Sequence, residues 1–331
     1  MNSVGSLWMW GLFGSVVLVM LALDLGVFHR TAHRVRMREA AIWVAVWVSL
    51  AMAFNVFVSQ RFGTARGLEF LQAYLLEQAL SVDNVFVFIV VFKYFRVPES
   101  YQHRVLFWGI LGAVLTRGAF VLAGAALISR FHWLMYGLGV FLIATSVKMF
   151  TQGDDEVDPS KNKILRLFRR LVPMTAAYEE ARFVVRREGR WLATPLMAVL
   201  VVVEATDVMF AVDSIPAVFG VTTDVFIVYT SNIFAILGLR SLFFLVAGLV
   251  SKLHLLKHGV ALILAFIGFK ILVESFVHIS EVISLLVLAS ILLISTVLSF
   301  AFPARQDPPD EPPVEPAEGG EAPPASASAG P

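Results

Sequence analysis

The sequence predicts an all-α, polytopic membrane protein with about nine transmembrane helices. Of its 331 residues, 58% are hydrophobic and only 15% are charged. Apolar runs of about 20 residues, the length that crosses a bilayer, recur along the chain. A soluble chain of this length could bury one large core, but it would not repeat such runs. The basic residues are also sorted into alternate loops.

The predicted spans cover nearly the whole chain up to residue 302. The first is too long for a signal-peptide core and contains Asp24, so we expect it to be retained. The fourth and fifth are so close that they must form a helical hairpin. In order, the spans are residues 7–28, 41–60, 69–92, 105–127, 131–150, 193–219, 225–249, 256–275 and 281–302.

The loop charges predict the orientation. Loops after the first, third, fifth and seventh spans are basic, whereas the alternate loops hold only Arg61, Arg66 and Arg130. Because basic residues mark the cytoplasmic side, the N-terminus is expected outside and the C-terminus inside. The basic loops are ordinary membrane flanks, so we expect no nucleic-acid binding.

Two segments outside the spans are expected in the cytoplasm. In loop 151–192, residues 163–172 alternate basic and apolar faces at helical spacing, which suits either a helix on the inner leaflet or a plain cytoplasmic helix. Residues 303–331 contain nine prolines and six acidic residues, so they are expected to form a disordered tail. Residues 1–302 would then be the transporter domain.

Spans three to five and six to eight are predicted to be repeats, over residues 69–150 and 193–275. The second span of each carries one arginine, Arg117 or Arg240, followed at nearly equal distances by a histidine and a lysine. Since each repeat has three spans, the second copy would enter the membrane from the opposite side. Inverted repeats of this kind build secondary transporters, with a site near the midplane.

Carboxylates within the spans are the candidate site. An ionised carboxylate at the centre of a spanning helix costs about 2.5–3.5 kcal/mol on insertion scales, so such groups are functional by default. The first span of each repeat carries a pair six residues apart, and Glu204 lies one turn from the second pair. The five are Glu77, Asp83, Glu204, Asp207 and Asp213.

Oxygen ligands dominate this part of the sequence. The chain has no cysteine, and its histidines lie in loops or at span ends. Carboxylates with an amide or hydroxyl oxygen favour Mg²⁺, Ca²⁺ or Mn²⁺. Asn84 is an expected ligand, with a helix-packing hydrogen bond as the equal alternative for Asn84, Ser214 and Asn232. The supporting residues are Ser214, Asn232, Arg117, Arg240 and Asp24, with the arginines expected to hold carboxylates when no metal is bound.

The six-residue spacing predicts which carboxylates form the central site and which lie nearer the outer exit. Six residues turn a helix by about 240° and raise it by about 9 Å, so one metal cannot bridge both acids of a straight helix. We therefore expect Asp83 and Asp207 to form the central site, with Glu77 and Asp213 nearer the outer exit. Pro216 favours a helix break over residues 213–216.

Four segments of this sequence resemble the TerC family, named for tellurium resistance, and its Alx-type branch. They are Leu76–Asn84, Tyr101–Gly109, Glu204–Pro216 and Thr230–Ser241. The resemblance covers roughly residues 7–302. It implies a bacterial inner-membrane protein whose better-studied relatives export Mn²⁺, and it places the family's acidic residues on the five carboxylates above.

The expected function is export of a divalent cation, with Mn²⁺ preferred and Ca²⁺ as the alternative, by alternating access and with protons as a possible counter-ion. No prosthetic group is expected. The alternative function is a membrane scaffold for metal or tellurite stress, or for metal supply to secreted enzymes. An intramembrane enzyme is not expected, because no zinc-protease, Gly-x-Gly-Asp or Ser–His arrangement occurs in the spans.

Overall fold

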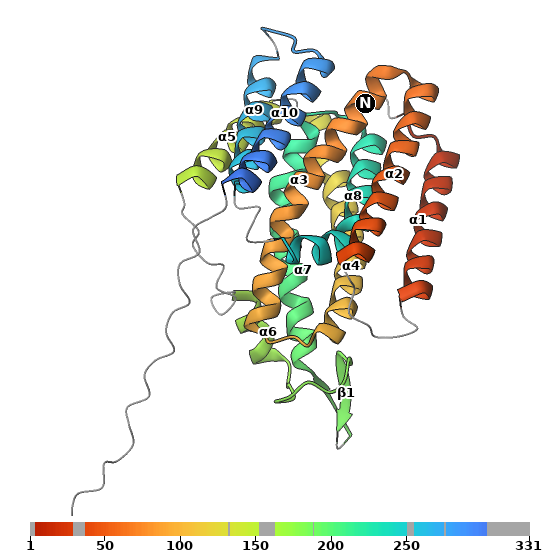
Figure 1. Cartoon of the computed structure of the whole chain (residues 1–331), viewed down its shortest axis with the longest axis vertical. Coiled ribbons are helices and arrows are strands. Elements are labelled where there is room, and N and C mark those ends of the chain that lie inside the picture. Colours follow the sequence, from red (N-terminus) through yellow and green to blue (C-terminus); the bar gives the residue numbers. More distant parts are fainter. Residues whose placement is uncertain are drawn as a thin grey trace, which may run out of the picture.

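The computed structural model is a bundle of long helices (Figure 1). It describes residues 4–28, 37–131, 133–151, 163–187, 189–249, 255–274 and 276–302. Within these, the side chains of residues 21–28, 83, 163 and 169 fall outside the description. The predicted disordered tail, 303–331, therefore lies outside the described residues.

Every predicted span falls on a helix. The helices are α1 (Leu7–Phe28), α2 (Met37–Phe62), α3 (Thr64–Tyr94), α4 (Glu99–Arg130), α5 (Leu134–Thr151), α6 (Lys163–Leu171), α7 (Pro195–Phe219), α8 (Val225–Ala247), α9 (Leu256–Val273) and α10 (Glu281–Ala301). Among the described residues, eight helices are long and apolar enough to cross a membrane, and Leu7–Met20 of α1 forms a shorter apolar stretch. The count of nine spans remains a prediction.

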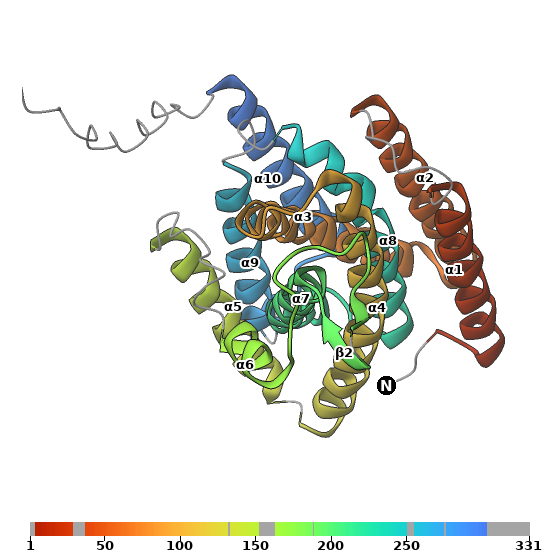
Figure 2. The ribbon, with the colours of Figure 1, turned by 90° about the horizontal axis from the view of Figure 1, so that it is seen from below.

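Helices α3, α4, α7 and α8 form the centre of the bundle. Figure 2 shows α1 and α2 along one side of this group, and α5, α9 and α10 along the other. Between the two predicted repeats, α3 packs on α8, α4 on α7 and α5 on α9. These reciprocal pairings are the ones that an inverted repeat requires, although the repeat itself stays a prediction.

Local sequence explains where several central helices begin. Asp224 caps α8 by accepting hydrogen bonds from the backbone N–H of Phe226 at 2.9 Å and Ile227 at 3.3 Å. Its other oxygen accepts from the N–H of Val4 at 2.8 Å, which ties the start of the described chain to α8. Pro195 opens α7, where its missing N–H costs no helical hydrogen bond.

The predicted break in α7 at residues 213–216 is wrong. The helix continues from Pro195 through Pro216 to Phe219. Pro216 lies in the last turn, so few residues follow it, and the helix loses one backbone hydrogen bond there without ending. Asp207 and Asp213 therefore lie on one continuous helix.

A small β-hairpin extends from one end of the bundle, which we call the hairpin end (Figure 1). Strand β1 (Val184–Arg187) pairs antiparallel with β2 (Arg190–Ala193). Gly189 adopts a φ of +79° in the turn, a conformation that glycine tolerates without strain. This strand pair was not expected from the sequence. The opposite end of the bundle, where α3 begins and α7 finishes, is called the far end.

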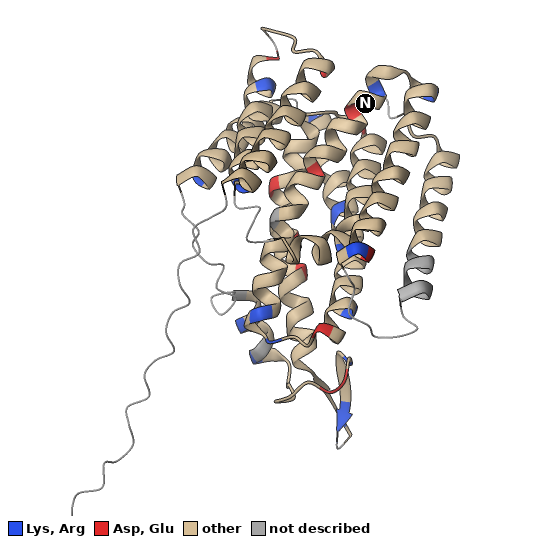
Figure 3. Cartoon of the chain, in the orientation of Figure 1, with Lys and Arg blue, Asp and Glu red and all other residues tan. Residues whose placement is uncertain are grey.

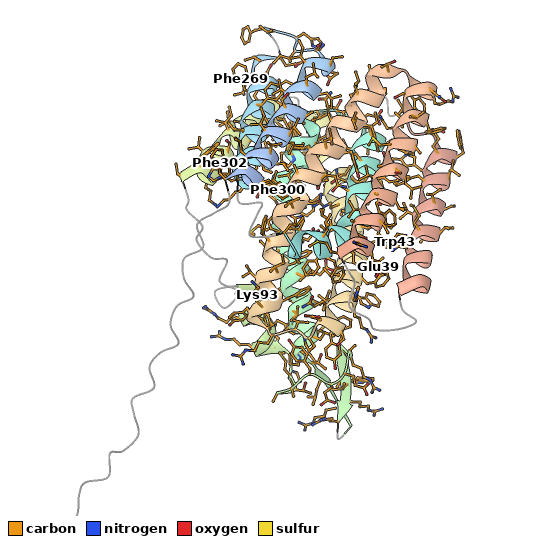
Figure 4. The ribbon with its side chains drawn as sticks, in the orientation of Figure 1. Glu39, Trp43, Lys93, Phe269, Phe300 and Phe302 are labelled. Atoms are coloured by element: carbon orange, nitrogen blue, oxygen red, sulfur yellow. The ribbon has the colours of Figure 1, made fainter. Side chains whose placement is uncertain are left out.

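The side-chain distribution separates central from peripheral helices. Most of α8 is buried, whereas only 17% of the apolar window of α2 and of α10 is buried. Figure 4 labels three exposed aromatic residues on the outer side of α9 and α10, namely Phe269, Phe300 and Phe302. Exposed apolar side chains of this kind suit a lipid environment, since they would be unfavourable in water.

Helices α5 and α9 cross at two glycines. A Cβ added to Gly268 would lie 2.7 Å from the carbonyl oxygen of Gly139, and one added to Gly139 would lie 3.1 Å from that of Gly268. Small residues allow helix backbones to approach closely, which is how membrane helices commonly gain contact. The third helices of the two predicted repeats are thus joined backbone to backbone.

Candidate functional site

Arg117 of α4 is the centre of a buried polar cluster. Its side chain is 1% exposed and forms an ion pair through Nη1 with Oε1 of Glu77 on α3, which is fully buried. A buried charge is expensive unless it is paired and hydrogen-bonded, so the two side chains depend on each other. Positions of charged residues occur along helices within the bundle as well as at its ends (Figure 3).

Asp207 of α7 faces the same guanidinium. Its Oδ1 lies 3.8 Å from Nη2 of Arg117, and the Asp207 side chain is 4% exposed. The hydroxyl of Thr116 donates to Oδ2 of Asp207 at 3.4 Å. One arginine therefore contacts a carboxylate from each predicted repeat, and the three charges sum to −1.

Two uncharged side chains complete the contacts of Arg117. Its Nη1 donates to Oδ1 of Asn232 on α8 at 2.8 Å and to the hydroxyl of Ser214 on α7 at 3.3 Å. Asn232 is itself held by a hydrogen bond from Nδ2 to the carbonyl of Val228 at 3.0 Å. The cluster thus draws a side chain from each of the four central helices.

The charged members of the cluster share one depth. Glu77 lies 13 residues from the start of α3, Arg117 lies 13 from the finish of α4, and Asp207 lies 12 from the finish of α7. At 1.5 Å per residue, each is about 18–20 Å from the far end. They therefore lie near the middle of a membrane-spanning bundle.

Glu204 and Asp213 flank this level along α7. Glu204 lies one turn nearer the hairpin end, is half-buried, and its carboxylate occupies the space beside Gly112 of α4, where a Cβ would overlap it. Asp213 is also half-buried, lies nearer the far end, and is attracted electrostatically by Lys148 of α5. A buried carboxylate is thus bracketed by two more accessible ones.

The remaining predicted residues are less defined. Asn84 is 2% exposed and Arg240 is 3% exposed. Asp83 lies in α3 and Asp24 in α1, but both side chains lie outside the described residues. The expected pairing of Asp83 with Asp207 is therefore untested, whereas Glu77 lies beside Arg117 at the level of Asp207 and not toward the outer exit.

The described side chains contain no group of three or more His, Cys, Asp or Glu that could hold a metal. Glu77 and Asp207 are instead directed at Arg117. For both to bind a divalent cation, Arg117 would have to withdraw, because two positive groups cannot occupy the same space between them.

Sequence reasoning missed a second polar network near the far end. Arg66 donates to both oxygens of Glu69, whose Oε2 also accepts from the hydroxyl of Thr222. Lys270 of α9 is buried, with only 5% of its surface exposed. Its ammonium group lies 3.2 Å from both oxygens of Glu281, although α10 was not assigned any role.

Gln72 of α3 hydrogen-bonds to the same Glu281 that pairs with Lys270. Its Nε2 donates to the carboxylate and the backbone carbonyl of Glu281, each at 2.9 Å. Glu69, Lys270 and Glu281 line a cavity of about 400 Å³. The signal that could have revealed the network is the position of Lys270 inside an apolar run, where a lysine needs an anionic partner.

Comparison with known proteins decides the family. A family model described as "Integral membrane protein TerC family" matches residues 62–307, which include the whole polar cluster. The chain belongs to the TerC family. The match also covers the second network, whereas α1 and most of α2 precede it.

Several relatives span nearly the full chain. An uncharacterized membrane protein of Myxococcus xanthus, STKORF319, is 52% identical over 297 residues, which cover 90% of this chain and 93% of the relative. Alx of Escherichia coli (strain K12), provisionally described as a membrane-bound redox modulator, is 45% identical over 316 residues, which cover 93% of this chain and 98% of the relative. No solved structure matches the chain significantly.

Proposed function

We propose that this TerC protein exports a divalent metal cation, Mn²⁺ in the first instance, from the bacterial cytoplasm by alternating access. One observation supports this above the others: Arg117 is buried between Glu77 of α3 and Asp207 of α7. Buried carboxylates at mid-membrane mark ion pathways, and here they come from both predicted repeats.

Arg117 would act as a tethered cation in this mechanism. While Arg117 lies between the carboxylates, it offsets their charge and stabilises their burial. When a divalent ion enters, the ion's two charges replace the single charge of the guanidinium, which also gives up its hydrogen bonds to Asn232 and Ser214. The exchange couples binding of the ion to movement of α4 against α7.

The carboxylates of α7 supply a route to this site. The ion would meet half-buried Glu204 first, then buried Asp207, then half-buried Asp213. Successive positions are about 4.5 Å and 9 Å apart along a straight helix. Glu204 and Asp207 lie about 60° apart around the helix and can share one route, whereas Asp213 projects about 120° away from Asp207 and would receive the ion in a different crevice.

Ligand chemistry narrows the substrate only in part. Oxygen-only ligands suit Mn²⁺ and Ca²⁺ equally, so the preference for Mn²⁺ rests on the family resemblance. Protons are the proposed counter-ion, because carboxylates in a buried site would bind protons when they release the metal. The hairpin end is assigned to the cytoplasm, since the described basic segments 93–104 and 163–187 lie there.

The second candidate function is a membrane scaffold for metal or tellurite stress, which would use the basic cytoplasmic segments or the acidic tail. Redox modulation, as described provisionally for Alx of E. coli, is favoured by no side chain that we can identify. The chain has no cysteine, so it offers no thiol for disulfide exchange.

Transport by purified protein in proteoliposomes tests the proposal. Efflux of Mn²⁺ should fall at least tenfold in Glu77→Gln and in Asp207→Asn, with Ca²⁺ and Mg²⁺ compared under imposed pH gradients. Glu99→Gln, at an exposed position at the start of α4, is the matched control and should retain wild-type flux.

Wild-type flux in both Glu77→Gln and Asp207→Asn would show that these two carboxylates do not bind the transported ion. Absence of any metal flux from the wild-type protein would contradict the function. Deletion of residues 303–331 separates the alternatives, because a transporter should keep its activity whereas a scaffold that uses its tail should lose it.

A further inference from the structure

Helix α6 carries two different apolar faces. Leu165 is 2% exposed, and together with Phe168 it packs into the protein core. Ile164, Leu167 and Leu171 are instead exposed, by 50%, 57% and 71%. Their spacing of three and four residues places them in one stripe along the helix.

A basic stripe follows the other side of the helix. Arg166 and Arg170 are both exposed and lie four residues apart, so they project from one face. The helix contains no acidic residue that could neutralise them. An amphipathic helix with leucine and isoleucine on one face and arginine on the other is typical of helices that lie in the bilayer interface.

The position of α6 fits such a surface. The helix follows α5 and packs against α7, both of which are long enough to cross a membrane. Figure 2 shows α6 at the rim of the bundle rather than across its middle. The exposed stripe therefore lies at the rim of the bundle, beside the helix α7 on which α6 packs.

We infer that α6 is a lipid-binding element that binds anionic phospholipid headgroups through Arg166 and Arg170 while Ile164, Leu167 and Leu171 enter the acyl boundary. Leu165 and Phe168 fix the helix to the bundle, so lipid binding is coupled to the position of α7. Charge complementarity favours an anionic bilayer surface over a neutral one, and the inference is independent of transport.

The absence of cysteine from the chain permits a direct test on the full-length protein. A nitroxide is attached to Leu167→Cys, and separately to Arg190→Cys at the exposed hairpin. Collision with oxygen and with a water-soluble nickel chelate is then measured in phosphatidylcholine vesicles with and without one-third phosphatidylglycerol. The label at 167 should be accessible to oxygen and protected from nickel with phosphatidylglycerol, and the label at 190 should stay accessible to nickel.

Removing both arginines isolates the headgroup contribution. Arg166→Gln with Arg170→Gln, in the Leu167→Cys background, should lower the ratio of bilayer-inserted to water-exposed label at residue 167 about 30-fold, because each basic residue near an anionic surface adds roughly a fivefold preference. Arg186→Gln with Arg190→Gln changes the same charge on the hairpin and should have no such effect.

Three results would overturn the inference. The label at 167 could be as accessible to nickel as the one at 190, which would place α6 in water. It could insert equally without phosphatidylglycerol, which would exclude headgroup binding. It could also be protected from both reagents, which would indicate contact with protein, either a second copy or another chain.

Discussion

Nη1 of Arg117 donates a hydrogen bond of 2.8 Å to Oδ1 of Asn232, although 115 residues separate them in the chain. The bond connects α4 to α8, the second helices of the two predicted repeats. Because the same guanidinium pairs with Glu77 and faces Asp207, one side chain links all four central helices. Its removal should therefore affect the whole bundle.

Substitution of Arg117→Gln should destabilise the protein by about 3–5 kcal/mol, because it leaves two carboxylates buried without a cation. Thermal unfolding of the purified protein in lipid nanodiscs measures the change. The double variant Arg117→Gln with Glu77→Gln removes one of the orphaned charges, so it should be more stable than Arg117→Gln alone. Equal unfolding temperatures for all three proteins would show that the ion pair has no structural role.

Substitution of Gly268→Ala should destabilise the contact between α5 and α9 by about 1–3 kcal/mol. The added methyl group would press against the backbone carbonyl of Gly139, which cannot rotate away. Gly137→Ala is a suitable control, because nothing lies within 4 Å of its added Cβ. The expected order of unfolding temperatures is wild type and Gly137→Ala together, then Gly268→Ala below them.

Substitution of Gly112→Ala should impair metal flux more than stability. Its methyl group would displace the Glu204 carboxylate, the far end of a flexible side chain that can turn aside at little cost. We expect flux to fall several-fold in proteoliposomes while the unfolding temperature stays within a few degrees of wild type. Unchanged flux would place Glu204 outside the ion route.

Substitution of Lys270→Met should destabilise the protein by about 1–3 kcal/mol, because Glu281 loses its cationic partner in a partly buried setting. Lys93→Met is the control, since Lys93 lies in the last turn of α3 with an exposed side chain. The charge swap Lys270→Glu with Glu281→Lys should recover part of the loss in thermal unfolding. If both single variants unfold alike, the pair contributes nothing.

The helices could be predicted because long apolar runs require no knowledge of partners. The same reasoning indicated that carboxylates inside such runs need compensation. It could not show that Arg117 pairs with Glu77, because that choice depends on how α3 and α4 are rotated about their axes. The network of Gln72, Lys270 and Glu281 was missed for a similar reason, since residue spacing does not show which side chains of α3, α9 and α10 come into contact.

The prediction at Pro216 failed for a different reason. We treated proline as a helix breaker without weighing its position, yet in the last turn it has little helix left to redirect. We overlooked the strands Val184–Arg187 and Arg190–Ala193, because several of their residues are basic and the alternation of apolar and polar residues typical of a strand is weak. Only the turn at Gly189 would have drawn attention to them.

The pairing of Glu77 with Arg117 also bears on how the chain is made. The two residues are 40 positions apart and both precede α7, so the pair can form before the second half of the chain leaves the ribosome. The insertion machinery would then release α3 and α4 as a charge-compensated hairpin. Asp207 and Asn232, which arrive later, would join an arginine already held in place, so synthesis itself sets the order in which the cluster is assembled.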